Sequence, residues 1–309
     1  MAISAEKLVP DSEVFQYKEQ GFLLKKGLVD QKTIEALRAD TLLICRGKYA
    51  MPNPSPKTAE SKGGKPDGGA SEPAQAIKKV PDSMPDAEVM KNFLCIHFPH
   101  KISPLQRDFL LYPGIAAVLT RIISPNVKCM QSMLFVKPPG LPGQAWHQDE
   151  IYIPTRDRSL CGVWIALDDA TIENGCLWVI PGSHKKGVIH PMKPHNKPDE
   201  WDFAGCSYGF DESQKVSVEA KAGDVIFFNG YLLHSSLRNR SKNQYRRALA
   251  NHYMSAESLL PWHGNMGGGQ GDYRDVVLVA GQDPYAYKGT EDIAQVWVRE
   301  YDRKAAGVE

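Results

Sequence analysis

Polar and apolar residues alternate with a period of two through most of the second half of the chain, which predicts β-strands rather than helices. Turns that contain glycine or proline separate these segments, and no helical pattern intervenes between them. Short strands joined in this way are typical of an antiparallel barrel or sandwich, and they argue against a parallel sheet. The strands are expected at Val127–Val136, Cys161–Leu167, Leu177–Ile180, Lys215–Glu219, Val225–Phe228 and Arg246–Met254.

The first third of the chain shows a helical period instead. Asp30 stands where an N-cap is needed, directly before an apolar stripe at helical spacing. Ser103 followed by Pro104 is a second helix start, with serine as the cap and proline in the first turn. We expect helices from Asp11–Ser12 to Glu19, from Gln31 to about Lys48, from Pro104, and from Ile115 to Ile123, with a strand at Gly21–Leu24. These helices are expected to cover one outer face of the barrel.

Residues 50–76 break both patterns. They are rich in proline and glycine with scattered charges, so they cannot bury enough apolar surface to order themselves. The segment interrupts a compact unit rather than joining two, which favours a long loop that acts as a lid. An inert insertion explains the composition equally well. We therefore expect one domain over residues 1–309, with a flexible insertion at about residues 50–76.

The composition narrows the classes of partner. With 42% hydrophobic and 24% charged residues, the chain is typical of a globular protein. Its net charge of +1 gives no general attraction to nucleic acid or to an anionic membrane, and no apolar run reaches the length of a membrane span. The first residues lack the apolar core of a signal peptide, and the six cysteines contain no C-x-x-C pair. A cytoplasmic protein with a small-molecule partner, and neither a nucleic-acid nor a membrane partner, is expected.

Two histidines and a carboxylate form the strongest chemical signal. His147 and Asp149 lie two residues apart, so on an extended strand both side chains point to the same face. A second histidine, His234, follows the Gly223–Asp224 turn and the strand Val225–Phe228. Two imidazoles and one carboxylate cover one face of an octahedral ion and leave three positions open, as non-heme Fe(II) oxygenases require. A structural role is the alternative for any one histidine, but the grouping of three residues favours a metal site.

An arginine pair, Arg246 and Arg247, follows the second histidine. A 2-oxoacid that binds the metal through its carboxylate and keto oxygen fills two open positions and leaves one for O2. Its distal carboxylate is then buried and needs a forked, charged donor, which arginine supplies better than lysine. Adjacent strand residues face opposite ways, so only one of the two arginines can serve. His252 lies at an even spacing from Arg246 and is expected to pack in the same interior.

The motifs around these residues resemble the phytanoyl-CoA dioxygenase family. Besides the metal and arginine motifs, the resemblance is carried by Gly162–Trp164, Asn174–Leu177 and Ile180–His184. It covers roughly Val14 to Tyr253. It implies an Fe(II)- and 2-oxoglutarate-dependent oxygenase on a double-stranded β-helix, a mainly β jelly-roll barrel buttressed by N-terminal helices. In the family the co-substrate arginine follows an aromatic residue directly; here that residue is Tyr245, which favours Arg246.

The same resemblance implies further contacts with 2-oxoglutarate, from Ser236, Gln148, Gln144, Trp164 and Met133. Ser236 stands two residues after the distal histidine, and Gln144 three residues before the proximal one. Met133 and Trp164 would also be interior packing in any jelly roll, so for these two the alternative stays open. The family has a co-substrate lysine in its N-terminal region. We expect its counterpart between Lys91 and Lys101.

Asp149 bears on the reaction type. Halogenating relatives have glycine or alanine in place of this carboxylate, so its presence predicts hydroxylation or another two-electron oxidation, with succinate and CO2 as co-products. The substrate is expected to be a small metabolite or natural-product intermediate, bound with help from Tyr152, Arg156 and Arg158. Two rivals stay open: a metal-containing jelly roll that binds a ligand without turnover, and a Zn or Mn cupin-like hydrolase or isomerase.

Overall fold

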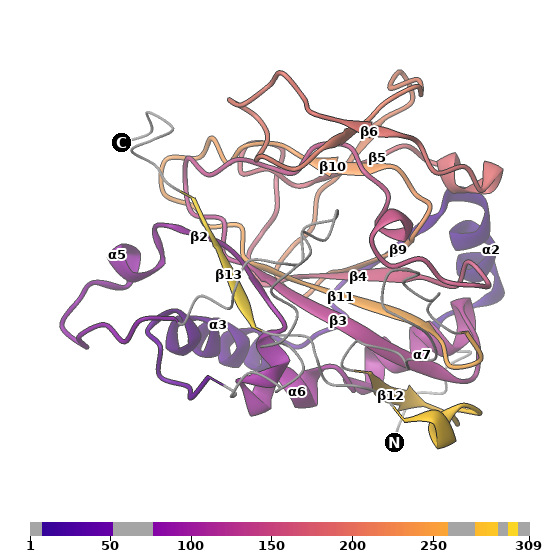
Figure 1. Cartoon of the computed structure of the whole chain (residues 1–309), viewed down its shortest axis with the longest axis horizontal. Coiled ribbons are helices and arrows are strands. Elements are labelled where there is room, and N and C mark those ends of the chain that lie inside the picture. Colours follow the sequence, from indigo (N-terminus) through magenta and orange to yellow (C-terminus); the bar gives the residue numbers. More distant parts are fainter. Residues whose placement is uncertain (1–7, 52–76, 259–275, 290–295, 302–309) are drawn as a thin grey trace, which may run out of the picture.

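The computed structural model describes residues 8–51, 77–258, 276–289 and 296–301. Two antiparallel sheets face each other, and helices cover the outer side of the larger sheet (Figure 1). In the view of Figure 1, most helices lie below the larger sheet and the smaller sheet lies above it. The mainly β class and the antiparallel pairing predicted from the sequence are confirmed.

The larger sheet has the strand order β1-β9-β4-β11-β3-β2-β13, with β12 also paired to β3. Its strands are β1 (Phe22–Lys25), β2 (Phe93–His97), β3 (Val127–Phe135), β4 (Cys161–Ala166), β9 (Val225–Asn229), β11 (Ala248–Ser255), β12 (Val277–Ala280) and β13 (Trp297–Glu300). The smaller sheet has the order β10-β5-β8 and consists of β5 (Leu177–Val179), β8 (Val216–Val218) and β10 (His234–Ser236). A separate pair joins β6 (Met192–Lys193) to β7 (Cys206–Ser207).

The helices begin largely where the sequence predicts. They are α2 (Asp11–Gln20), α3 (Gln31–Cys45), α5 (Asp86–Met90), α6 (Pro104–Phe109) and α7 (Pro113–Ile122), with 3-10 turns η1 (Pro99–Lys101), η2 (Asp149–Ile151), η3 (Ser183–Lys186) and η4 (Ala286–Lys288). Two predicted caps are confirmed, because Asp30 and Ser103 each accept from a backbone N–H three residues on, at 2.9 and 3.2 Å. Asp11–Ser12 were also expected to cap α2, and this is wrong, because Pro10 takes the N-cap position and Asp11 already lies in the first turn.

The face of the larger sheet toward the helices is filled with apolar side chains. Leu37 of α3 and Ile115 of α7 are fully buried against it. Val163, Phe227 and Leu249 point to this side from three neighbouring strands. Burying an aliphatic or aromatic side chain contributes roughly 1.5–3 kcal/mol, so this face is a main source of the fold's stability.

The opposite face of the larger sheet points to the smaller sheet and forms the barrel interior. Trp164, Ala250 and Met133 lie side by side in register across β4, β11 and β3. His97 of β2 continues the same row beyond Met133. Leu177 of β5 closes the interior from the smaller sheet. Because side chains alternate along a strand, this row and its neighbours on β11 decide what a bound molecule would meet.

Several elements differ from the prediction. Strands β2, β6, β7, β12 and β13 and helix α5 were missed. β2 shows one reason: all five of its residues are buried, so its sequence does not alternate. β11 begins at Ala248 rather than Arg246, and α3 ends at Cys45 because Gly47 adopts a positive φ of 65°. Of the predicted insertion, residues 52–76 lie outside the described residues. The single domain over residues 1–309 stays a prediction.

Candidate metal centre

The main chain brings the two candidate histidines together. His147 and His234 form an isolated antiparallel bridge, in which each backbone N–H donates to the other's carbonyl, at 3.0 and 3.1 Å. His234 opens β10, whereas Asp149 starts the turn η2, so the predicted single strand through His147 and Asp149 is wrong. The spacer Gln148 is nevertheless extended, with φ −128° and ψ 129°, and the two flanking side chains still point the same way.

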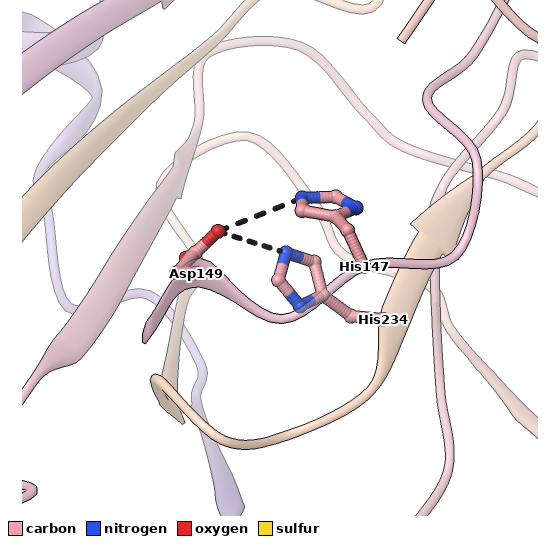
Figure 2. A group of neighbouring side chains, drawn as sticks. All are labelled: His147, Asp149 and His234. Carbon is pink, nitrogen blue, oxygen red and sulfur yellow. Dashed lines mark ion pairs between the residues drawn. The ribbon is translucent and has the colours of Figure 1, made fainter. Parts of the chain in front are cut away.

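The three side chains converge on one buried point (Figure 2). Asp149 Oδ1 lies 3.5 Å from His147 Nε2 and 3.6 Å from His234 Nε2, and one ligand atom from each residue lies within 4.8 Å of the others. The second ring nitrogens are tied to the backbone: His147 Nδ1 contacts Ala145 O at 2.7 Å, and His234 Nδ1 contacts Leu232 O at 3.0 Å. Because a carbonyl only accepts, each Nδ1 carries the proton. Both Nε2 lone pairs are therefore available to a metal.

The electrostatic surroundings keep this triad in the form that binds a metal. Burial lowers the pKa of His234 to about 4, with His147 adding to the effect, so the imidazole of His234 is neutral in neutral solution. Burial alone would raise the pKa of Asp149, but His234 and His252 hold it well below the usual range. His252 Nε2 lies 2.9 Å from Asp149 Oδ2. His252 therefore orients the carboxylate, which corrects the prediction that it only packs in the interior.

Arg246 lies further along the interior, with only 3% of its surface exposed. Its guanidinium carbon lies 5.5 Å from the ring centre of Trp164 and 5.8 Å from that of Phe135, and its Nε has no hydrogen-bond partner. Burial lowers the pKa of Arg246 to about 10, which leaves it charged in neutral solution. Ala248 and Ala250 are the β11 residues that face the interior between Arg246 and the triad, and both side chains are small. A carboxylate beside Arg246 would satisfy the unpaired donor.

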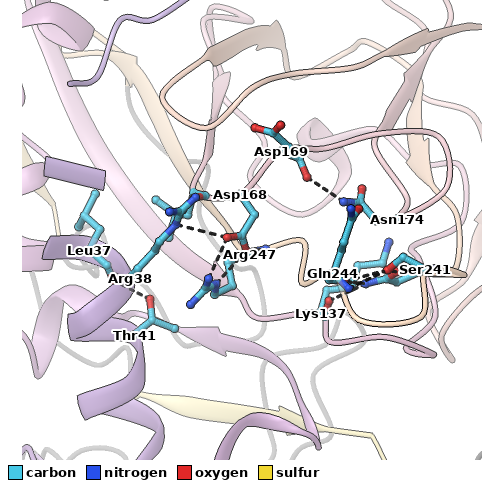
Figure 3. Close-up of polar contacts among 12 residues, drawn as sticks. Leu37, Arg38, Thr41, Lys137, Asp168, Asp169, Asn174, Ser241, Gln244 and Arg247 are labelled. Atoms are coloured by element: carbon cyan, nitrogen blue, oxygen red, sulfur yellow. Dashed lines mark hydrogen bonds and ion pairs between the residues drawn. The ribbon is translucent and has the colours of Figure 1, made fainter. Parts of the chain in front are cut away.

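Arg247 points to the other side of the sheet (Figure 3). It makes a two-pronged ion pair with Asp168, through Nε–Oδ2 and Nη2–Oδ1 contacts of 2.8 Å each. Arg38 of α3 approaches the same carboxylate at 3.3 Å. Of the two adjacent arginines, the structure therefore turns Arg246 to the interior and leaves Arg247 fully engaged on the helix side.

Other residues predicted to contact 2-oxoglutarate surround the same interior. Ser236 Oγ accepts from the backbone N–H of Gln144 at 3.2 Å, which joins the end of β10 to the segment that leads into His147. Met133 and Trp164 face the interior from β3 and β4. The structure thus brings these four residues to one region, and their contacts with the co-substrate stay predictions.

Some residues predicted to bind the co-substrate or the substrate make other contacts in the structure. The side-chain amide of Gln148 bonds to backbone atoms of two neighbouring loops. Arg158 lies over a tyrosine ring at 5.4 Å, and both Arg156 and Arg158 are exposed. Tyr152 lies beside the triad, with its ring centre 6.2 Å from that of His147. Among the three predicted substrate residues, Tyr152 is thus the one that the described contacts bring to the metal centre.

Lys137 is a buried cation that the sequence did not indicate. It is 1% exposed, and its Nζ donates to the carbonyl of Leu237 and lies 3.5 Å from Ser236 Oγ. Burial and the nearby Arg246 hold the pKa of Lys137 well below the usual range. Lys137 therefore fixes the segment after β10 next to Arg246. A lysine before a proline pair is an ordinary turn sequence, so no sequence signal marked it.

Three more polar residues were also missed: His97, Arg299 and the partner of Arg299, Asp202. His97 faces the interior beside Met133, in the stretch between Lys91 and Lys101 where a lysine was expected. Arg299 of β13 pairs with Asp202. These residues come together because β13 pairs with β2, and pairing between strands so distant in sequence gives no periodic signal.

Known proteins are similar to this chain in sequence. The sequence profile of the phytanoyl-CoA dioxygenase (PhyH) family matches residues 17–248. A phytanoyl-CoA dioxygenase from Arabidopsis thaliana is 35% identical over 162 residues, which are 52% of this chain and 56% of that protein. The peroxisomal phytanoyl-CoA dioxygenase of Rattus norvegicus is 27% identical over 293 residues, which are 91% of this chain and 78% of that protein. The match thus spans little more than half the length of the plant relative.

Solved structures show the same fold. The non-heme alpha ketoglutarate dependent carbocyclase SnoK from nogalamycin biosynthesis superposes with a TM-score of 0.60 at 21% identity, over 91% of this chain and 100% of that one. The predicted jelly-roll fold is thereby confirmed. Within the described segments, no helix combines the length and apolar character needed to cross a membrane. Since the profile spans most of the chain, the protein belongs to the phytanoyl-CoA dioxygenase family, whose enzymes use iron and 2-oxoglutarate.

Proposed function

We propose that this protein hydroxylates an unactivated C–H bond of a small molecule, with iron bound by His147, Asp149 and His234, and with succinate and CO2 as co-products. One observation carries the proposal: the buried triad shares the barrel interior with a buried arginine, Arg246, whose Nε is unpaired. A metal-bound 2-oxoacid needs both features, because one end of it binds the ion and the other end is a carboxylate.

The donor set fits iron. Two neutral imidazole nitrogens and one carboxylate oxygen suit Fe(II) better than an all-oxygen or an all-sulfur site does. When bound, iron with O2 and 2-oxoglutarate supplies the oxidising power for C–H cleavage. The chain contributes orientation: backbone carbonyls of Ala145 and Leu232 fix the two imidazoles, and His252 fixes the Asp149 carboxylate.

The surroundings of Arg246 fit the distal carboxylate of 2-oxoglutarate. The guanidinium offers a fork of donors that matches a carboxylate in two bonds. Trp164 and Phe135 enclose it, which excludes water and strengthens the ion pair. Ala248 and Ala250 leave the space between Arg246 and the triad that the carbon chain of the co-substrate would fill. Ser236, held by Lys137, adds a hydroxyl at the edge of this space.

Neither rival function accounts for Arg246. A Zn or Mn hydrolase or isomerase on the same three ligands would have no use for a buried arginine directed at a dicarboxylic co-substrate. A jelly roll that binds a ligand without turnover would have no use for the triad and Arg246 together. Hydroxylation is preferred over halogenation because Asp149 occupies the place where a halide would bind.

An anaerobic titration tests the proposal. Metal-free protein receives Fe(II) and then 2-oxoglutarate, and the visible charge-transfer band of the chelated 2-oxoacid is recorded. We expect the band to saturate at one equivalent of each. Tight Fe(II) binding without a band would favour the hydrolase or isomerase instead. Succinate release over a panel of metabolites, measured in air, then separates an active oxygenase from a silent binding protein.

A further inference from the structure

Strand β13 lies outside the segment that matches the family profile and adds residues to the interior. It pairs with β2 so that Trp297 lies opposite His97 and Arg299 opposite Cys95. β2 in turn pairs with β3, where His97 lies opposite Met133. Side chains in register share a face of the sheet, so Trp297 and Arg299 face the same interior as the co-substrate residues.

His97 links this strand to the metal centre. Its ring stacks on Trp297, with ring centres 3.7 Å apart and planes inclined by 12°. Its Nε2 is buried without a hydrogen-bond partner. Burial, Arg299 and His252 together hold the pKa of His97 well below the usual range, so the ring is neutral. The unpaired His97 Nε2 can therefore form a hydrogen bond with a bound molecule. His97 lies between β13 and His252, and His252 in turn contacts Asp149.

Arg299 is the charged group on this side of the interior. Its Nη2 pairs with Asp202 Oδ2, while Asp202 Oδ1 accepts from the backbone N–H of Ala204 at 3.0 Å. Both carboxylate oxygens of Asp202 are therefore engaged, and its side chain is only 5% exposed. The Arg299 side chain keeps 22% exposure, and a guanidinium has five N–H donors. In this pair, the cation is the partner that can still bind a molecule.

Tyr152 lies in the interior beside the triad. It follows η2, the turn that Asp149 begins, and its ring centre lies 6.2 Å from that of His147. Arg299 faces the same interior from β13, two residues after the tryptophan that stacks on His97. Burial raises the pKa of Tyr152 to about 12. The ion pair and the metal ligands therefore lie on the same side of the larger sheet.

We propose that Arg299, held in place by Asp202, binds a carboxylate of the substrate to be oxidised, and that His97 and Tyr152 line the space between this anchor and the triad. The proposal rests on the proposed oxygenase function. A guanidinium with a buried acid on one side and open donors on the other matches a carboxylate in two bonds. The sequence candidates for such a role, Arg156 and Arg158, are exposed. The substrate class is therefore a small organic acid whose oxidised carbon lies between its carboxylate and the iron.

Spectroscopic titration tests this assignment with defined probes. The protein is loaded anaerobically with Fe(II) and saturating 2-oxoglutarate, and then titrated with benzoate, phenylacetate, cinnamate and octanoate, each beside its primary amide. A molecule that binds next to iron shifts the charge-transfer band, whereas one that displaces 2-oxoglutarate removes it. We expect at least one acid to bind about tenfold more tightly than its amide, which corresponds to about 1.4 kcal/mol.

Variants assign the preference to one residue. R299Q should lose the preference for the acid, and R299K should keep part of it because the charge remains without the fork. R240Q is the matched control, since Arg240 also pairs with an acid, Glu200, but on the surface with 58% of its side chain exposed. R240Q should bind the probes as the wild type does. Should R299Q fail to fold, the smaller preference of R299K tests the same point.

The outcomes separate the two proposals. If no acid binds more tightly than its amide, or if the R299Q and R299K variants keep the full preference, Arg299 is not an anchor for a carboxylate. If the wild type shows no charge-transfer band before any probe is added, the oxygenase function itself is wrong. A normal band without a preference for acids refutes the anchor alone.

Discussion

The two faces of the larger sheet differ in how many of their buried polar groups have partners. On the helix side the core is apolar, and the half-buried charge of Arg247 is matched by Asp168. On the interior side, Arg246 Nε, His97 Nε2 and His252 Nδ1 are buried without hydrogen-bond partners. Buried polar groups nearly always have hydrogen-bond partners in folded proteins, and burying one without a partner costs about 1–3 kcal/mol. On the helix side, β11 leaves one such atom, Asn251 Oδ1. The three unmatched nitrogens of the interior are therefore the ones that mark this face as built for a ligand.

Neighbouring residues of strand β11, and of the two arginines directly before it, show this contrast. Arg246 faces the interior and Arg247 the helix side; Leu249 packs in the helix-side core, and Ala250 faces the interior. One strand thus stabilises the fold with one set of side chains and leaves space for a ligand with the other. Substitutions at alternate positions should therefore separate ligand binding from stability.

The largest expected effect is at the triad. His234→Ala removes one of three ligands, so Fe(II) binding should fall to background in an anaerobic metal titration. His184→Ala is the control, because His184 lies on η3 and contacts the backbone of Lys18 instead. A His234→Ala protein that bound one Fe(II) as tightly as the wild type would falsify the metal assignment.

The second-largest effect is expected at the two adjacent arginines, whose alanine variants should differ in 2-oxoglutarate binding. Arg246→Ala leaves the distal carboxylate of 2-oxoglutarate buried and unpaired, a loss that typically costs about 3–5 kcal/mol. The dissociation constant of 2-oxoglutarate, from the charge-transfer band, should therefore rise by about two to four orders of magnitude. Arg247→Ala should lower the melting temperature and leave this constant nearly unchanged. The reverse pattern would show that the interior and helix sides are assigned the wrong way round.

Variants of the neighbouring residues Leu249 and Ala250 compare the packing of the two faces, through stability and 2-oxoglutarate affinity. Leu249→Ala opens a cavity in the helix-side core and should lower the free energy of unfolding by about 2–5 kcal/mol in urea titrations, with 2-oxoglutarate affinity retained. Ala250→Leu should do the opposite, because it fills the space next to Trp164 and Met133 and weakens 2-oxoglutarate binding more than stability. Equal losses of affinity in the two variants would contradict a ligand space on one face only.

The smallest effect is expected at Glu257, an exposed residue just beyond β11. Hydrogen bonds from Asn126 and Ser255 lower the pKa of Glu257 to about 2, below its ordinary value of 4.5. The folded pKa is the lower one, so the stabilising contribution is present above pH 4.5 and fades as the pH falls toward 2. Glu257 is exposed, so this contribution is small. Glu257→Gln should flatten the melting temperature over this pH range, and an unchanged slope would show that these bonds contribute nothing.

The parts of the site that were predictable depend on local spacing. His147 and Asp149 were identifiable because one extended spacer residue puts both side chains on one side, and Gln148 is extended although no strand forms around it. The alternation of side chains predicted that only one of Arg246 and Arg247 faces the interior, and the family resemblance, through Tyr245, favoured Arg246. The spacing of the two ligands and the alternation are geometry over a few residues, which the sequence specifies directly.

The parts that were missed depend on contacts between distant segments. His97 and Arg299 reach the interior only because β13 pairs with β2, and His252 reaches Asp149 across the barrel. Lys137 is similar, since its bonds to Leu237 and Ser236 join two turns that are remote in sequence. A single sequence carries no record of such pairings, so these residues look like ordinary core or turn positions.

The bridge between His147 and His234 also connects iron content to local opening of the chain. Two main-chain hydrogen bonds hold these segments together, and an ion bound by both histidines would add a third connection at the same point. A ligand that binds only the closed form stabilises it by mass action. Removal of the ion should therefore speed hydrogen exchange at the amides of His147 and His234 before it affects the helix-side core. Exchange at these two amides would serve as a gauge of metal occupancy that needs no knowledge of the substrate.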